Sequence, residues 1–215
     1  MSKMTRQIVR CAVCGNKVNE TIFLSSNAFG YSDLDFRPSE MMRSAMFMMV
    51  NMCPHCHYSN YHLNELMYPD VAKIVKSDTY QSLVASLYDR TSQKMFLHAY
   101  LYKAKDMKIK AIESFKRAAW AFDDIGDRNM SKKCREQALN MLEEFKDKSV
   151  SYAMIYIDMN RRIGQFDKAL EHIDKYIDTE LPQKEDKLWF SFEKKLCLKK
   201  DDKVHNCGEF LRGER

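Results

Sequence analysis

The sequence contains few residues that break helices, with only 4 Pro and 6 Gly among 215 residues. So few breakers favour helices over a fold of many short strands. The sequence also lacks an apolar signal-peptide segment near Met1 and any apolar run of about 18 residues, the length that a membrane-spanning helix needs. We therefore expect a cytoplasmic protein without a membrane partner, in a compartment where thiols stay reduced.

Positive charge is not concentrated anywhere in the sequence. The formal net charge is +5, and lysine pairs such as Lys194/Lys195 lie among Glu and Asp. Such mixtures are typical of solvated helix faces, whereas a dedicated nucleic-acid binder carries a dense basic stripe. The composition, 45% apolar and 30% charged, is that of a chain that folds around a core. These features make nucleic acid an unfavoured partner.

Common catalytic and nucleotide-binding signatures are missing. The sequence contains no G-x-x-x-x-G-K-[ST], G-x-G-x-x-G, H-E-x-x-H or G-x-S-x-G motif. The acidic pairs at 123–124 and 201–202 fall at expected helix ends, where short carboxylates act as caps. We therefore expect a protein that is not an enzyme.

Four of the 7 cysteines form two pairs, Cys11-Ala-Val-Cys14 and Cys53-Pro-His-Cys56. A two-residue spacer lets both thiolates of a tight turn point at one ion, and two such turns complete a tetrahedron. A closed set of four thiolates leaves no open position for catalysis. The pairs therefore predict one structural Zn²⁺ ion bound by all four cysteines, with iron as the alternative metal.

The residues around the pairs favour a zinc ribbon. Gly15 follows the first pair, where such a turn often needs a positive φ, and His57 occupies the equivalent place after the second. The spacer from Cys14 to Cys53 is longer than the roughly 15–20 residues of the commonest pattern, so it must itself fold. We predict strands at 21–24 and 45–52, joined by a polar stretch, within a zinc-ribbon-like module of residues 1–68.

Two other roles for these residues stay open. Redox-active dithiols of the thioredoxin kind lie at a helix start after a buried strand, a pattern that this sequence does not show, but a zinc-thiolate redox sensor remains an alternative. Nearby histidines are potential replacement ligands, although surface histidines without a role are commoner. They are His55, His57 and His62. The lone cysteines are expected to be inert thiols: Cys134, Cys197 and Cys207.

From Pro69 onward the apolar residues follow the helical spacing of three and four. Turn signals at Gly126, Gly164 and Leu181-Pro182 separate short helices, so successive helices should be antiparallel neighbours. The expected core faces include Met95, Ala99, Tyr102, Ile109, Ile112, Phe115, Ala119, Phe122, Cys134, Ala138, Ala153, Ile157, Ile173, Trp189 and Leu196. We therefore predict a mainly α protein with a helical domain at residues 69–215.

Two stretches of this region resemble tetratricopeptide (TPR) units, in which small residues let paired helices approach closely. The better match is 161–177, and the other includes Ala99 and Tyr102. The spacing from Ala111 to Ala169 is not a multiple of about 34 residues, so an irregular helical bundle is the alternative. Arrays of this kind bind a protein or peptide in a concave groove.

Taken together, four segments resemble a bacterial family known as domain of unknown function 2225. They are Cys11-Ala-Val-Cys14-Gly15, Ser32-Asp33-Leu34-Asp35-Phe36-Arg37-Pro38, Cys53-Pro54-His55-Cys56 and Arg161-Arg162-Ile163-Gly164. His57 stands where the family pattern has Gly. The resemblance implies a metal-binding N-terminal part and a TPR-like body, and it implies no established activity.

The charged residues Asp33, Asp35 and Arg37 lie between the two cysteine pairs and have two interpretations. In one, the carboxylates accept backbone N–H groups and pair with the arginine to clip the loop. In the other, the residues form a contact surface. The favoured hypothesis for the whole chain is a zinc-binding protein-interaction adaptor, with a redox sensor or a nucleic-acid-binding zinc ribbon as alternatives.

Overall fold

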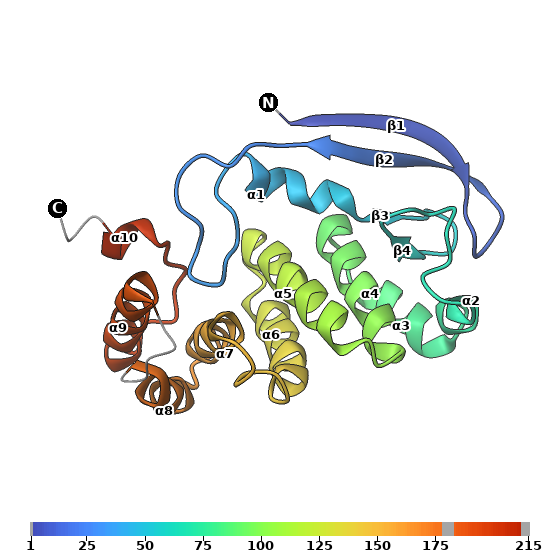
Figure 1. Cartoon of the computed structure of the whole chain (residues 1–215). Helices are drawn as coiled ribbons and strands as arrows, with labels where there is room; N and C mark the ends of the chain where they lie inside the picture. The colour runs from blue at the N-terminus through green and yellow to red at the C-terminus, as the bar shows by residue number, and fades with distance from the viewer. Residues whose placement is uncertain (1, 178–182, 212–215) are drawn as a thin grey trace. The chain divides into compact units, whose positions relative to one another are not determined.

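A computed structural model describes residues 2–177 and 183–211 of the chain. The protein is mainly α-helical with two small antiparallel sheets near its N-terminus, which confirms the predicted fold class (Figure 1). The chain forms two compact units, each built from two segments. Unit 1 comprises Met1–Asn27 and Met41–Cys134, and unit 2 comprises Ala28–Glu40 and Arg135–Arg215.

The two units group the chain differently from the predicted parts: residues 69–134 belong to unit 1, and Ala28–Glu40, from the spacer between the cysteine pairs, belongs to unit 2. The chain leaves unit 1 after Asn27 and returns to it at Met41. The units are groups of contacts within one chain, so separate domains at 1–68 and 69–215 stay a prediction.

Unit 1 begins with a long hairpin. Strand β1 (Lys3–Arg10) pairs antiparallel with β2 (Lys17–Ser25), from Arg10↔Lys17 at the turn to Met4↔Phe23 near the open end. The predicted strand at 21–24 lies within β2 and is confirmed. Strand β1 was not predicted, because nearly all of its side chains are exposed and it therefore lacks the apolar–polar alternation of a half-buried strand.

The predicted strand at 45–52 is wrong for most of its length. This stretch contains the last residue of helix α1 (Met42–Ala45) and the 3₁₀ helix η1 (Met46–Met49), and only β3 (Asn51–Met52) is a strand. Methionine has high helix propensity, and the segment offers no β-branched residue before Val50. Strand β3 pairs with β4 (Ser59–Asn60).

The rest of unit 1 consists of helices joined by short turns. Ser77 caps α3, its hydroxyl accepting a hydrogen bond from the Tyr80 amide, and Asp89 caps α4 through its carboxylate, which accepts from the Ser92 amide. Helices α4 and α5 pack closely together, and the predicted core residues there are buried, except Ile109, which is 50% exposed. The helices are α2 (Val71–Val75), α3 (Asp78–Ser86), α4 (Arg90–Ala104), α5 (Lys108–Asp124) and α6 (Arg128–Leu142), the last of which continues into unit 2.

Unit 2 is built on helices that follow α6, with α8 packing against both α7 and α9. Its core contains the predicted residues Ala153, Ile157, Ile173 and Trp189. The predicted break at Gly164 lies between α7 and α8, where this residue has a φ of 81°, whereas the predicted break at Leu181-Pro182 lies outside the described residues. The helices are α7 (Val150–Arg162), α8 (Phe166–Ile177), α9 (Lys184–Leu198) and α10 (Gly208–Leu211).

The segment Ala28–Glu40 is held in unit 2 by backbone hydrogen bonds to the C-terminal region. The amide of Leu34 donates to the carbonyl of His205 at 3.0 Å, and the amide of Cys207 donates to the carbonyl of Ser32 at 2.8 Å. The indole of Trp189 donates to the carbonyl of Leu34 at 3.2 Å. A polar spacer thus becomes part of the second core, with Leu34 buried in it.

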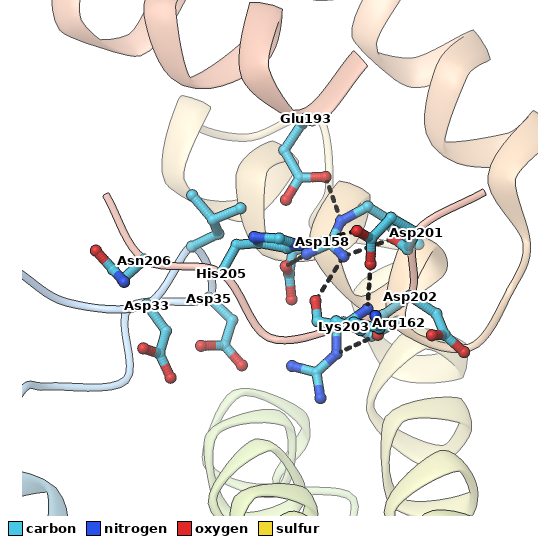
Figure 2. Close-up of polar contacts among 12 residues, drawn as sticks. Asp33, Asp35, Asp158, Arg162, Glu193, Asp201, Asp202, Lys203, His205 and Asn206 are labelled. Carbon is cyan, nitrogen blue, oxygen red and sulfur yellow. Dashed lines mark hydrogen bonds and ion pairs between the residues drawn. The ribbon is translucent and has the colours of Figure 1, made fainter. Parts of the chain in front are cut away.

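Arg161 is the polar centre of unit 2. Its Nε donates to Glu193 Oε2 at 2.7 Å, and its Nη2 donates to Asp158 Oδ1 at 2.6 Å. Its Nη1 donates to the carbonyls of Asp201 and Lys203 at 2.9 and 2.8 Å (Figure 2). One buried guanidinium therefore joins α7, α9 and the segment after α9.

Two buried carboxyl groups face this single cation. Burial, followed by the negative charge of Asp158, raises the pKa of Glu193 to about 8. Asp158 Oδ2 and Glu193 Oε1 are buried and receive no donor from the described residues, and a proton on Glu193 would lie between the two side chains. A protonated Glu193 leaves one carboxylate to balance the charge of Arg161, which reduces the cost of burying the group.

Glu193→Gln should mimic the protonated side chain, because its carbonyl still accepts from Arg161 and its amide can donate to Asp158. The pKa of Glu193 in the folded state, about 8, lies above its ordinary value of 4.5. Its stabilising protonation is therefore complete below about pH 4.5 and is lost as the pH rises through about 8. Relative to the wild type, the variant should gain up to about 1.4 kcal/mol of unfolding free energy per pH unit in this window, and the gain should level off above it.

Denaturant unfolding at several pH values measures this difference. Glu185→Gln, at an exposed position in the first turn of the same helix, is the matched control and should show no such trend. Parallel curves for Glu193→Gln and the wild type from pH 5 to 8 would show that Glu193 is ionised in the folded protein at neutral pH.

Candidate metal centre

The first cysteine pair forms the turn of the β1–β2 hairpin. The amide of Cys11 donates to the carbonyl of Asn16 at 2.9 Å, and the amide of Gly15 donates back to the carbonyl of Cys11 at 2.8 Å. Gly15 has a φ of 76°, as expected for the residue after such a pair. These bonds fold four residues so that Cys11 and Cys14 lie on the same side of the turn.

The second pair, between β3 and β4, repeats the same backbone pattern. The amide of Cys53 donates to the carbonyl of Tyr58 at 2.9 Å, and the amide of His57 donates to the carbonyl of Cys53 at 2.9 Å. His57 has a φ of 62°. The histidine therefore occupies the left-handed conformation that a glycine would take most easily, and the departure from glycine leaves the turn geometry unchanged.

The four sulfur atoms converge. All of them lie within 4.8 Å of one another, and the distances Cys11 Sγ–Cys56 Sγ and Cys14 Sγ–Cys53 Sγ are both 3.7 Å. A tetrahedron of sulfurs about 2.3 Å from a zinc ion has edges of about 3.8 Å. A disulfide needs about 2.05 Å, so the four cysteines are free thiols. The arrangement fits a tetrahedral ion of the size of zinc.

Crowding shifts the pKa values of three of these thiols in different directions. A hydrogen bond from Cys56 lowers the pKa of Cys11 to about 5. The same bond, seen from the donor, raises the pKa of Cys56, and burial raises the pKa of Cys53. Four adjacent thiolates repel one another, and a divalent cation at their centre removes that repulsion. A divalent cation would therefore favour the thiolate form of all four cysteines, which is the form that binds metal.

Both cysteine turns pack on one side against the apolar core of unit 1. Cys11 and Cys53 are buried and belong to the core of unit 1 together with Val18 and Tyr58. Cys14 and Cys56 are half-buried. The hydroxyl of Tyr80 on α3 donates to the carbonyl of His57 at 2.8 Å, so a helix supports the second turn directly. The centre is thus enclosed on one side and open to solvent on the other.

Glu20, which was not among the predicted site residues, links the hairpin to the segment that follows the second turn. This buried side chain accepts a hydrogen bond from the Leu63 amide at 2.5 Å through Oε2. Its Oε1 lies 3.1 Å from Nε2 of Gln7 and 3.3 Å from Nδ1 of His62. The available signal was its position between Val18 and Ile22, on the inward side of a strand with period two.

Asn51 makes a second link that the sequence did not reveal. Its Nδ2 donates to the carbonyls of Thr21 and Tyr61, each at 2.9 Å, and its Oδ1 accepts from the Thr21 amide at 2.9 Å. A single amide side chain thereby joins β2, β3 and the end of β4. Together with Glu20, it holds the two cysteine turns in register.

The other candidate ligands stay outside the centre. Within residues 2–177 and 183–211, the four cysteines are the one group of three or more Cys, His, Asp or Glu side chains with donor atoms close enough for an ion. His62 contacts Glu20, as described, and His55 and His57 do not join the sulfurs. Cys134 and Cys197 are buried, and Cys207 is half-buried.

The residues Asp33, Asp35 and Arg37 are buried in unit 2, with Asp35 and Arg37 only 3% and 2% exposed. The amide of Arg37 donates to Asp35 Oδ1 at 3.3 Å, and the amide of Asp33 donates to the carbonyl of Arg37 at 2.8 Å. The bond to Asp35 is the kind expected if its carboxylate clips the loop by accepting a backbone N–H group. Burial argues against the contact-surface interpretation, because little of these side chains can reach another molecule.

The fold and the site define a mainly helical protein with a four-cysteine cluster that can hold a metal ion. A family model described as "Uncharacterized protein conserved in bacteria (DUF2225)" matches residues 4–191, and the chain belongs to this family. Comparison with curated proteins and with solved structures gives no match. Among the described helices, none has both the length and the apolar character that crossing a bilayer requires.

Replacing a single cluster cysteine should abolish metal binding. Cys11→Ser and Cys56→Ser each remove one of four converging sulfurs, so we expect bound metal to fall from about one ion per chain to none after dialysis against a chelator. Structural zinc contributes on the order of 10 kcal/mol to the folding of small zinc modules, so the free energy of unfolding should fall by several kcal/mol. Elemental analysis and thermal melts measure the two effects.

The control for this experiment is Cys207→Ser, which changes a half-buried thiol in unit 2. It should retain the metal. An unchanged metal content in Cys11→Ser would show that the four sulfurs do not form the binding site.

Proposed function

We propose that this chain is a non-catalytic, zinc-binding adaptor of the cytoplasm that binds a protein or peptide through its helices. The observation that carries the proposal is the closed set of sulfurs at Cys11, Cys14, Cys53 and Cys56. Four protein ligands complete the tetrahedral coordination shell of the ion, so no coordination position is left for water or substrate. This supports a structural role for the metal and leaves recognition to the rest of the molecule.

Zinc is the ion that best suits such a role. Sulfur tetrahedra bind both zinc and iron, but zinc has no redox chemistry and tolerates the geometry without preference. The chain places the cluster beside the apolar core of unit 1, where Tyr58 and Tyr80 hold the second turn by side-chain packing and a hydrogen bond. Because zinc does not change its oxidation state, its charge stays constant, which fits a centre whose surrounding residues are held in place by packing and hydrogen bonds.

A pocket in unit 2 supports the second half of the proposal. Its volume is about 180 Å³, smaller than the roughly 300–1,000 Å³ of sites for drug-sized ligands. It suits one side chain or one chain end of a larger partner. Residues of α6, α7, the turn after α7 and α8 line it with mixed charges and amides, among them Glu136, Asn140, Tyr156, Asn160, Gln165 and Lys168.

The pocket adjoins the stretch of the chain that most resembles a TPR unit, since Ile163, Gln165 and Lys168 line it. The stretch at 161–177 that best matches a TPR unit in sequence comprises the end of α7, the turn at Gly164 and α8, and Ala169 in it is fully buried. Neutral amides beside both signs of charge favour recognition of a peptide backbone and its polar side chains. We propose this pocket as the anchor point for the partner.

Metal analysis of the purified full chain tests the first half of the proposal. The expected result is about one zinc per chain, with four thiols that react only after chelation. Iron in its place would contradict the proposed metal. An absence of metal, together with reversible disulfides among the cluster cysteines, would instead support the redox-sensor alternative.

Site-specific photo-crosslinking tests the second half. A photoreactive amino acid in place of exposed Asn140, at the pocket, should give a discrete crosslinked partner in cells. The matched control is the same substitution at Lys187, an exposed position on α9 outside the pocket. Adding Lys168→Glu should reduce the Asn140 product at least threefold. Equal products from Asn140 and Lys187 would contradict the pocket as the binding site.

A further inference from the structure

Strand β1 forms the outer edge of the N-terminal hairpin. It pairs with β2 in a two-stranded sheet, and β2 lies between β1 and the other elements of unit 1 (Figure 1). All of its eight residues are exposed except Val9, which is half-buried. Among the described residues, no further strand pairs with it. Its second edge is therefore open along its whole length.

The backbone pattern shows which groups point out from this edge. The amide of Cys11 donates to the carbonyl of Asn16 at the hairpin turn. Because hydrogen-bonded and non-hydrogen-bonded pairs alternate along an antiparallel ladder, the pair Arg10↔Lys17 is of the second kind. The same alternation applies along the uninterrupted register as far as Met4. The outward N–H and C=O groups thus belong to Met4, Arg6, Ile8 and Arg10.

The side chains of these four residues share one face of the strand, since successive side chains alternate. Met4 is 41% exposed and Ile8 is 72% exposed. Arg6 and Arg10 lie between and beside them, so apolar and cationic side chains alternate along the open edge. Across from Arg10, β2 adds Lys17. The two strands contain one acidic residue, Glu20, which is buried on the opposite, inward side.

We propose that the open edge of β1 binds an extended, acidic segment of another protein, which adds to the hairpin as a third strand. The edge supplies backbone hydrogen bonds, Arg6 and Arg10 select acidic side chains, and Met4 and Ile8 contact apolar ones. An incoming strand of six to eight residues, with acidic and apolar side chains on one face, complements this pattern. The surface belongs to unit 1 and does not depend on the pocket of unit 2.

Two other occupants fit the edge less well. A second copy of the chain would bring Arg6 and Arg10 against the same cations, which disfavours self-pairing. A nucleic acid would use the positive charge but not the backbone groups or the apolar Ile8. The hairpin also has no exposed aromatic ring on which a base could stack, since its one aromatic residue, Phe23, is half-buried. An acidic strand uses all the features of the edge.

Peptide titration and amide exchange on the metal-loaded full chain test the proposal. The probes are dye-labelled six- to eight-residue peptides that alternate Glu or Asp with Val or Ile, and the control peptides carry Lys in place of the acids. Acidic probes should bind at least tenfold more tightly than basic ones. Binding should slow hydrogen exchange at the amides of Met4, Arg6, Ile8 and Arg10, and leave the already bonded amides of β1 unchanged.

Two variants distinguish the contribution of side-chain charge to peptide binding from that of backbone hydrogen bonds. Arg6→Glu should weaken binding of the acidic probe at least tenfold, whereas Lys73→Glu, at an exposed cation on α2, should not. Ile8→Pro removes an outward N–H without removing a bond to β2, so it should abolish binding while the melting temperature stays within a few degrees. The exchange measurement on the wild type decides the matter if this variant fails to fold.

Three results would overturn the proposal. The first is failure of every acidic probe to bind, or binding without protection of the outward amides. The second is binding of a single-stranded oligonucleotide that Arg6→Glu abolishes and Ile8→Pro leaves unchanged, which would assign the edge to nucleic acid. The third is concentration-dependent protection of the same amides without a probe, which would assign it to a second copy of the chain.

Discussion

The convergence of four sulfurs is the constraint on which unit 1 depends. It joins the hairpin turn at Cys11 and Cys14 to the turn at Cys53 and Cys56, with sulfurs of different turns 3.7 Å apart. The second sheet consists of two-residue strands and cannot hold its turn by backbone pairing alone. An ion bound only by the folded chain would hold the two turns together, and its binding free energy would add to the stability of the fold. Glu20 and Asn51 then fix the register that the ion requires.

The same loop also belongs to the second core, which is organised by a different buried charge. The guanidinium of Arg161 donates hydrogen bonds to two carboxyl groups and two carbonyls from separate segments of unit 2, and so joins these segments as a bound ion would. The middle of the loop, at Leu34, is hydrogen-bonded to His205 and Trp189. The spacer between the cysteine pairs therefore has fixed partners in both units, which accounts for its unusual length.

Local rules were sufficient where a few neighbouring residues determine the geometry. The C-x-x-C spacing predicted both turns, and His57 took the expected left-handed conformation despite its side chain. The helical period predicted most core faces. Prediction failed at 45–52, where an apolar run has no period that distinguishes strand from helix, and at β1, whose exposed side chains carry no burial pattern. The contacts of Leu34 and Arg161 join distant segments, and single-sequence patterns contain no information on such pairings.

In strand β1, which was not predicted, Arg6 and Arg10 can serve both to prevent self-association and to bind a partner. An open edge strand invites pairing with any other edge, and proteins commonly oppose this with charged side chains. Arg6 and Arg10 supply that charge on β1, at positions whose backbone groups point outward. Charge of one sign repels an identical edge but attracts an acidic one, so the feature that prevents self-association also defines a partner. The repulsion between Arg6 and Arg10 and an identical edge therefore also gives β1 its selectivity for an acidic strand.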